Sequence, residues 1–248
     1  MLLYKFVPTV EIAGQVAKGV YRFYELTKYR KLEENTGRSD PSEGSLSFPN
    51  EEIQRYPDAL PIGSFKGVEF SCVSVSLDDD YLSQYFVFCV SIESSESAIG
   101  GCNYMVELDT DIFDFFEMLL PTPTLPGGNP DGKKFFSHAP VEYYDINNHP
   151  ALMEGEAWKE AYIKHNRFSY QNEYRAAMCI SDEYFVKAGA RSLIYRTQGR
   201  DEAGNSLDVK LLVSSGTDEE GWRYLELDVS EFQSAILPEP MKITALSS

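Results

Sequence analysis

The chain has 248 residues, of which 43% are hydrophobic and 25% are charged, the composition of a globular protein that can bury a substantial core. Its formal net charge of −17 argues against a protein that holds an extended nucleic acid through its overall field, because phosphate binding rests on clustered Lys and Arg. No apolar run approaches the roughly 20 residues needed to cross a bilayer, so we expect no membrane segment.

The first residues, "MLLYKFVPTVEIAG", lack the basic start, long apolar run and small-residue cleavage site of a signal peptide, so we expect a cytoplasmic protein. Cys72, Cys89, Cys102 and Cys179 stand apart from one another, with no C-x-x-C pair. They are interpreted as buried free thiols of a reducing compartment. The three histidines show no metal-ligand spacing, so no metal is predicted.

The first elements alternate strands with short helices. "LLYKFV" (2–7) and "VYRFYE" (20–25) predict strands, and "VEIAGQVAKG" and "LTKYRKLEEN" predict helices, the first of them entered through Pro8 and Thr9. From 36 to 61 the chain turns to Gly, Ser, Pro and charged residues without periodicity. This composition predicts a long irregular loop of the kind that often carries function.

The middle of the chain predicts a hairpin and an amphipathic helix. "GVEFSCVSVSL" (67–77) and "QYFVFCVSI" (84–92) alternate in the manner of strands and are joined by an acidic turn, which predicts a β-hairpin. After a further strand in "CNYMVELD", the run "TDIFDFFEMLL" has apolar residues at i, i+3, i+4 and i+7, with Thr110 as N-cap. We expect this helix to lie against the sheet.

The last third ends in strands. "HPALMEGEAWKEAYIKHNRF" carries Trp158, Tyr162 and Ile163 at helical spacing, and "RFSYQNEYRAAM" (167–178), "SLIYRTQ", "SLDVKLLVSS" and "WRYLELDVS" predict strands. Grouped strands with few helices indicate a single α+β domain over 1–248, with a mixed, mostly antiparallel sheet.

The strand predicted at 167–178 has an unusual polar face. On a strand, Gln171, Glu173 and Arg175 point to one side, whereas Asn172 and Tyr174 point to the other. A carboxylate beside an amide and a guanidinium is suited to binding a sugar hydroxyl and to stabilising positive charge at an anomeric carbon. The structural alternative is that Glu173 and Arg175 bond to neighbouring strands or form an ion pair.

Two other motifs favour structural interpretations. "GGNPDGKK" has the spacing of a phosphate-binding loop, but Lys134 replaces the Ser or Thr that would hold Mg²⁺. Asp208 and Lys210 in "LDVK" have the acid-x-lysine spacing of some metal-dependent nucleases, a short pattern that is common by chance on an exposed strand face.

The order of landmarks resembles a bacterial family, domain of unknown function 2971. Its Tyr-Lys-aromatic strand corresponds to "YKF" (Tyr4–Phe6), and its Asp-Pro-x-Glu box to "DPSEG" (40–44). Its Cys-x-Ser strand corresponds to "FCVSI" and its acidic strand end to "MVELD". Its late Lys, followed by Glu and Arg, corresponds to "IKHNRFSYQNEYR".

A more distant resemblance implies an activity. "QNE" resembles the Gln-x-Glu motif of ADP-ribosyltransferases, and Arg22 and Ser74 fall in that family's order on predicted strands. The resemblance implies a split sheet and NAD as substrate. It also implies roles: Glu173 would stabilise the oxocarbenium-like transition state, Gln171 would position the acceptor and Arg22 would hold the pyrophosphate. The remaining cofactor-binding candidates are Ser74, Arg175 and the ring-stacking Tyr170 or Phe168.

Three hypotheses follow. The first is an ADP-ribosyltransferase-like enzyme that modifies a macromolecule, as a bacterial or phage toxin or defence effector. The second is a non-catalytic ligand-binding or protein-interaction module that uses the same strand and the loop at 40–43. The third is a metal-dependent nuclease acting through Asp208 and Lys210. The first requires Arg22, Ser74 and Glu173 to line one cleft.

Overall fold

The computed structural model describes residues 1–31, 45–49, 72–76, 84–94, 101–120, 136–144, 161–179, 192–200, 206–230 and 241–246. Over these ranges the chain is a mixed α+β structure with a mostly antiparallel sheet and few helices, as predicted. The described part contains no helix long and apolar enough to cross a membrane.

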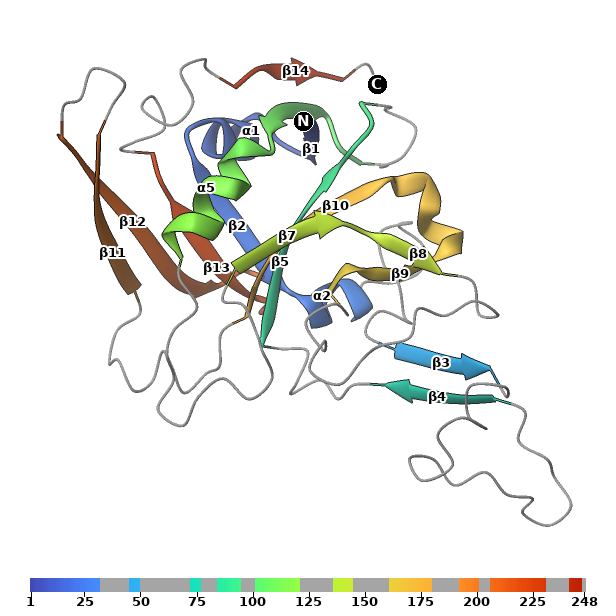
Figure 1. Ribbon diagram of the computed structural model, residues 1–248. Helices are drawn as coiled ribbons and strands as arrows, with labels where there is room; N and C mark the ends of the chain where they lie inside the picture. The colour runs from blue at the N-terminus through green and yellow to red at the C-terminus, as the bar shows by residue number, and fades with distance from the viewer. Residues whose placement is uncertain are drawn as a thin grey trace, which may run out of the picture.

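A branched ten-stranded sheet forms the body of the molecule (Figure 1). Its main path runs β11-β12-β13-β2-β5-β1-β6-β14, and a branch from β5 carries β10 and then β7. The strand bounds are β1 Leu2–Val7, β2 Val20–Glu25, β5 Tyr85–Ser91, β6 Tyr104–Asp109, β7 Phe136–Pro140, β10 Glu173–Cys179, β11 Ser192–Arg200, β12 Ser206–Thr217, β13 Arg223–Asp228 and β14 Ile243–Ala245.

Two small sheets lie beside this body. β3 (Ser45–Pro49) and β4 (Cys72–Ser76) form an antiparallel pair, which Figure 1 shows apart from the large sheet. β8 (Glu142–Tyr144) and β9 (Ile163–His165) form a parallel pair.

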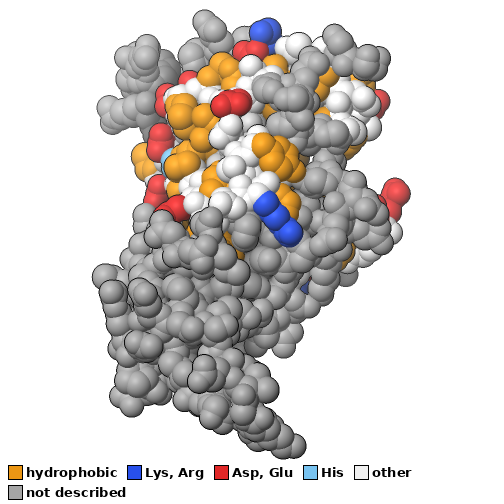
Figure 2. Space-filling view, turned by 90° about the vertical axis from the view of Figure 1, so that its right-hand side faces the viewer, with side chains coloured by type: hydrophobic (Ala, Val, Ile, Leu, Met, Phe, Trp, Pro, Cys, Tyr) orange, Lys and Arg blue, Asp and Glu red, His pale blue; other side chains and the backbone are white. Residues whose placement is uncertain are grey.

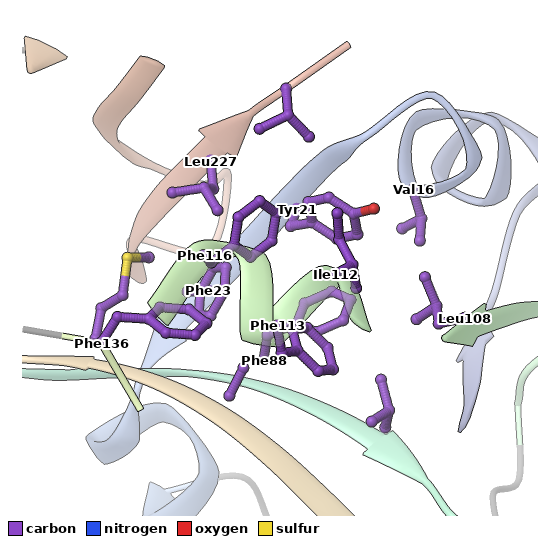
Figure 3. Close-up of a cluster of buried hydrophobic side chains, with 14 of the residues drawn as sticks. Val16, Tyr21, Phe23, Phe88, Leu108, Ile112, Phe113, Phe116, Phe136 and Leu227 are labelled. Carbon is purple, nitrogen blue, oxygen red and sulfur yellow. The ribbon is translucent and has the colours of Figure 1, made fainter. Parts of the chain in front are cut away.

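The hydrophobic core lies between the sheet and α5 (Asp111–Leu119) (Figure 3). Ile112, Phe113 and Phe116 of α5 are fully buried against Tyr21 and Phe23 of β2. Alternate residues of β2 thus face α5, which leaves the residues between them, Arg22 and Tyr24, for the other face.

Two shorter α-helices flank the first strands. α1 (Val10–Ala17) begins at Thr9, whose hydroxyl accepts a hydrogen bond from the Ile12 amide at 3.4 Å, and buries Ala13 and Val16. α2 (Leu26–Lys31) follows directly on β2. The strands and helices predicted for this region are confirmed.

The predicted hairpin is wrong. β4 pairs with β3, inside the segment predicted to be an irregular loop, whereas β5 pairs with β10, β2 and β1. β4 and β5 are neighbours in sequence, but they do not pair with each other: β4 pairs with β3 and β5 with strands distant in sequence, such as β10. Ile163, expected in a helix, lies in β9.

The polar strand predicted at 167–178 is only half a strand. Residues Asn166–Gln171 form a 3-10 helix, η4, and Asn172 has a φ of +40°, a left-handed conformation that Asn tolerates better than most residues. β10 begins at Glu173. Tyr174, Ala176 and Met178 of β10 are buried in the core, as expected of the opposite face.

The sheet forks at β5. One edge of β5 pairs with β10 along its whole length, from Glu173↔Ser91 to Cys179↔Tyr85. The other edge pairs with β2 near Val87 and with β1 at Ser91. β1 and β2 therefore diverge from opposite ends of the same edge, and the middle of β5 lies at the base of the fork.

Candidate functional site: a cavity in the fork of the sheet

A cavity of about 360 Å³ lies in this fork. Its lining includes residues of β1, α1, β2, α2 and the second half of β5, together with Lys164, Gln171 and Glu173. Aromatic rings of Tyr4, Phe6, Tyr24, Tyr29 and Phe88 contribute much of the lining. A volume in this range accommodates a small organic ligand.

The cavity lining is more basic than the chain as a whole. Among the described lining residues, four are cationic and two, Glu173 and Glu226, are carboxylates; the cations are Lys5, Arg22, Lys28 and Lys164. These six residues together carry a formal charge of +2, in a chain whose net charge is −17. On the face in Figure 2, basic side chains are scattered among hydrophobic and acidic ones. A local positive field favours an anionic ligand.

Glu173 is held between two buried cations. Arg175 donates from Nε to Glu173 Oε1 at 2.6 Å and from Nη2 to Oε2 at 3.3 Å, and Lys164 Nζ donates to Oε2 at 3.1 Å. Lys164 also donates to Gln171 Oε1 at 2.9 Å. Glu173, Lys164 and Arg175 are 6%, 2% and 0% exposed, so this is a buried charge network rather than a surface ion pair.

The network keeps Glu173 ionised. Burial raises the pKa of its carboxyl group, but the charges of Arg175 and Lys164 outweigh burial and hold the pKa well below its usual range. The backbone amide of Glu173 also donates to the Tyr143 hydroxyl at 2.9 Å. The three charged groups together carry a net charge of +1, next to the cavity.

Cys89 occupies the base of the fork. Its carbonyl oxygen accepts a hydrogen bond from Lys5 Nζ at 2.7 Å, so a side chain of β1 binds this edge of β5 between its two strand pairings. The Lys5 ammonium also lies 4.3 Å from the centre of the Phe88 ring. Burial raises the pKa of the Cys89 thiol to about 12, which favours the neutral thiol over the nucleophilic thiolate at neutral pH.

Arg22 lies on the β2 wall of the cavity. Its Nε and Nη2 donate to Glu226 Oε2 at 3.3 and 2.9 Å, and its guanidinium carbon lies 4.2 Å from the centre of the Tyr224 ring. Lys28, further along the same wall, donates to Asp218 at 3.0 Å and lies over the Tyr24 ring.

The structure brings together three of the predicted site residues. Arg22, Gln171 and Glu173 line the same cavity, although Gln171 belongs to η4 and not to a strand. Arg175 does not line the cavity; it binds Glu173 from behind. The Ser74 side chain lies outside the described part of the structure, and its backbone belongs to β4.

The two aromatic candidates contact residues of the cavity lining but are not among the described residues that form it. Phe168 is buried, with Lys164 Nζ 5.1 Å from its ring centre, and Tyr170 is 48% exposed. Neither ring is among the described lining residues, and the role in ring stacking stays a prediction. The side chains of Asp208 and Lys210, the loop at 40–43 and the "GGNPDGKK" segment lie outside the described residues.

Lys5, Cys89 and Lys164 line the cavity but were not among the predicted site residues. Each of the three belongs to a segment on which the predicted family resemblance rests: Lys5 to "YKF", Cys89 to "FCVSI" and Lys164 to "IKHNRFSYQNEYR". These landmarks, far apart in sequence, converge on one cavity. The spacing of residues within a single segment could not reveal this convergence.

Comparison of the chain with protein-family models, with curated proteins and with solved structures finds no match, so both resemblances stay predictions. Within the described ranges, no group of three or more His, Cys, Asp or Glu side chains is placed to hold a metal ion.

Proposed function

We propose that the fork cavity binds a nucleotide-class ligand, with NAD as the candidate. The observation that carries this proposal is the chemistry of the described lining residues: four cations and two carboxylates, together with aromatic residues, in a chain that is acidic as a whole. Phosphates match the positive field, and planar rings match the aromatic walls. A pocket that is largely apolar with a few converging polar groups is typical of small-molecule sites.

Calorimetric titration with NAD tests this proposal, using charge changes at the cavity wall. Ile12 lines the cavity and is 39% exposed, so Ile12→Glu and Ile12→Lys change the charge without removing a buried side chain. We expect Glu to weaken and Lys to strengthen NAD binding, each by about fivefold. Val10→Glu is the matched control, because Val10 is exposed on the same helix outside the cavity. Equal effects at Ile12 and Val10 would contradict binding in the fork.

A second candidate function is ADP-ribosyl transfer to a macromolecule, the activity expected of a toxin or defence effector. It is favoured by the presence of Arg22, Gln171 and Glu173 in one cavity. The pairing of Glu173 with the buried cations Lys164 and Arg175 opposes it, because a developing oxocarbenium ion needs negative charge that is not already neutralised. Binding without transfer, as in a sensor or interaction module, therefore fits the geometry better.

Release of nicotinamide from NAD separates the two candidates. Transfer through this site predicts release by the wild type, a loss of about 100-fold or more in Glu173→Gln, and retained release without acceptor labelling in Gln171→Ala. Both variants are first checked for folding by thermal unfolding. Saturable NAD binding without any release would assign the cavity to ligand binding alone.

A further inference from the structure

The guanidinium of Arg22 is fixed as a flat surface on the cavity wall. Arg22 and Glu226 are cross-strand partners on β2 and β13, and the two hydrogen bonds from Nε and Nη2 to Glu226 set the plane of the guanidinium. One face of that plane lies against the Tyr224 ring, with 4.2 Å between the guanidinium carbon and the ring centre.

The Tyr224 ring is itself held in place. It lies across Gly216, its partner on β12, where an added Cβ would come within 2.5 Å of the ring. The Tyr24 ring contacts it edge-on, with ring centres 5.9 Å apart. The support under Arg22 is therefore built from three strands, β2, β12 and β13.

Two of the in-plane donors of Arg22, on Nε and Nη2, are engaged by Glu226. Partial burial lowers the pKa of the guanidinium, but the hydrogen bonds and the charge of Glu226 outweigh burial and raise the pKa. An arginine that binds phosphate presents these in-plane N–H groups to the ligand. Arg22 instead has one face on Tyr224 while it lines the cavity with 37% of its side chain exposed.

We propose that the second face of the Arg22 guanidinium is the stacking surface for the planar ring of the bound nucleotide. This inference rests on the proposed function, because it assumes a nucleotide in the fork cavity. It replaces the role in pyrophosphate binding that the family resemblance implied for Arg22. Stacking of a planar cation on a base is favourable and tolerant of base identity, so the site selects for a ring and not for one nucleobase.

Calorimetry with AMP and ribose 5-phosphate tests the inference, since these two ligands carry the same phosphate and differ only in the base. Wild-type protein is expected to bind AMP about tenfold more tightly than ribose 5-phosphate. Arg22→Lys keeps the positive charge but removes the planar guanidinium. This variant should reduce the ratio of the AMP affinity to the ribose 5-phosphate affinity to about two. Arg167→Lys, an exposed arginine outside the cavity, is the matched control and should leave the ratio unchanged.

Tyr224 provides a second variant that leaves Arg22 intact. Tyr224→Phe keeps the ring under the guanidinium and should retain the preference for AMP, whereas Tyr224→Leu should lower it. An AMP preference that survives in Arg22→Lys would overturn the stacking role while leaving nucleotide binding in place. Equal affinity of the wild type for both ligands would also overturn it. No binding of either ligand would overturn the proposed function and the stacking role together.

Discussion

At the scale of single residues, the charge network of Glu173 decides what the site can do. Strand alternation predicted that the side chains of Gln171, Glu173 and Arg175 lie on the same side of the chain. In the structure, Lys164 donates hydrogen bonds to both Gln171 and Glu173, and Arg175 donates to Glu173. Lys164 escaped prediction because η4 turns the chain back, bringing residues seven and nine positions apart into contact. Strand periodicity contains no information about such a turn.

Removal of the Glu173 charge should destabilise the protein strongly. Glu173→Gln removes the carboxylate that binds both the buried ammonium of Lys164 and the buried guanidinium of Arg175, and we expect a loss of about 3–5 kcal/mol in the free energy of unfolding. Glu107→Gln, which removes the partner of the exposed Lys242, should cost less than about 1 kcal/mol. Urea denaturation measures both variants. Similar costs for the two would show that the network contributes little.

The same network predicts how stability depends on pH. Since the pKa of Glu173 is lower in the folded than in the unfolded chain, its contribution is fully present above the ordinary pKa of a glutamic acid, near 4.5. That contribution is lost as pH falls below that value and approaches the folded pKa. The difference in unfolding free energy between the wild type and Glu173→Gln should therefore shrink from pH 6 to pH 3. A constant difference over this range would contradict the assignment.

At the scale of elements, local pattern predicted the existence of strands better than their partners. The bounds of β1, β2, β6 and α5 follow from apolar alternation and helical spacing in short segments. The β4–β5 hairpin failed because both runs satisfy strand patterning equally well with distant partners. The fork depends on three long-range pairings of β5, with β1, β10 and β2, so the sequence of a single segment cannot predict it.

Two glycines test the packing of the elements around the site. Gly216→Ala places a Cβ within 2.5 Å of the Tyr224 ring, which must move, and we expect a loss of about 1–3 kcal/mol in unfolding free energy. Gly14→Ala, inside α1, meets nothing within 4 Å and should stabilise by about 0.5–1 kcal/mol. Thermal denaturation of both variants measures these opposite signs. A neutral Gly216→Ala would mean that the Tyr224 ring is not held across β12.

At the scale of the whole molecule, the net charge of the chain is negative, whereas the described residues that line the cavity carry a positive formal charge. The net charge of −17 correctly describes an acidic chain, but composition cannot reveal that four cationic side chains line one cavity. Salt weakens the field of the surface charges more than the field of the cavity lining. Exposed charges are screened over about 10 Å at 0.1 M salt, whereas partly buried charges are screened less.

This contrast predicts an unusual salt effect on association. The acidic molecule repels an anionic nucleotide at long range, so raising salt from 20 to 200 mM should increase the association rate of NAD by about twofold to fivefold. Stopped-flow mixing, monitored by protein fluorescence, measures this rate. A rate that falls with salt would indicate that the basic lining of the cavity controls the encounter.

The most direct test of the central claim is an NMR titration of methyl-labelled protein with NAD, a measurement that locates binding on a chain of 28.1 kDa. Binding in the fork predicts saturable shifts at the methyl groups of the cavity-lining residues Ile12, Val20 and Val90, with little change at the core residues Val213 of β12 and Leu225 of β13. Shifts confined to Val213 and Leu225, or no saturable shift at any of the five, would contradict ligand binding in the fork.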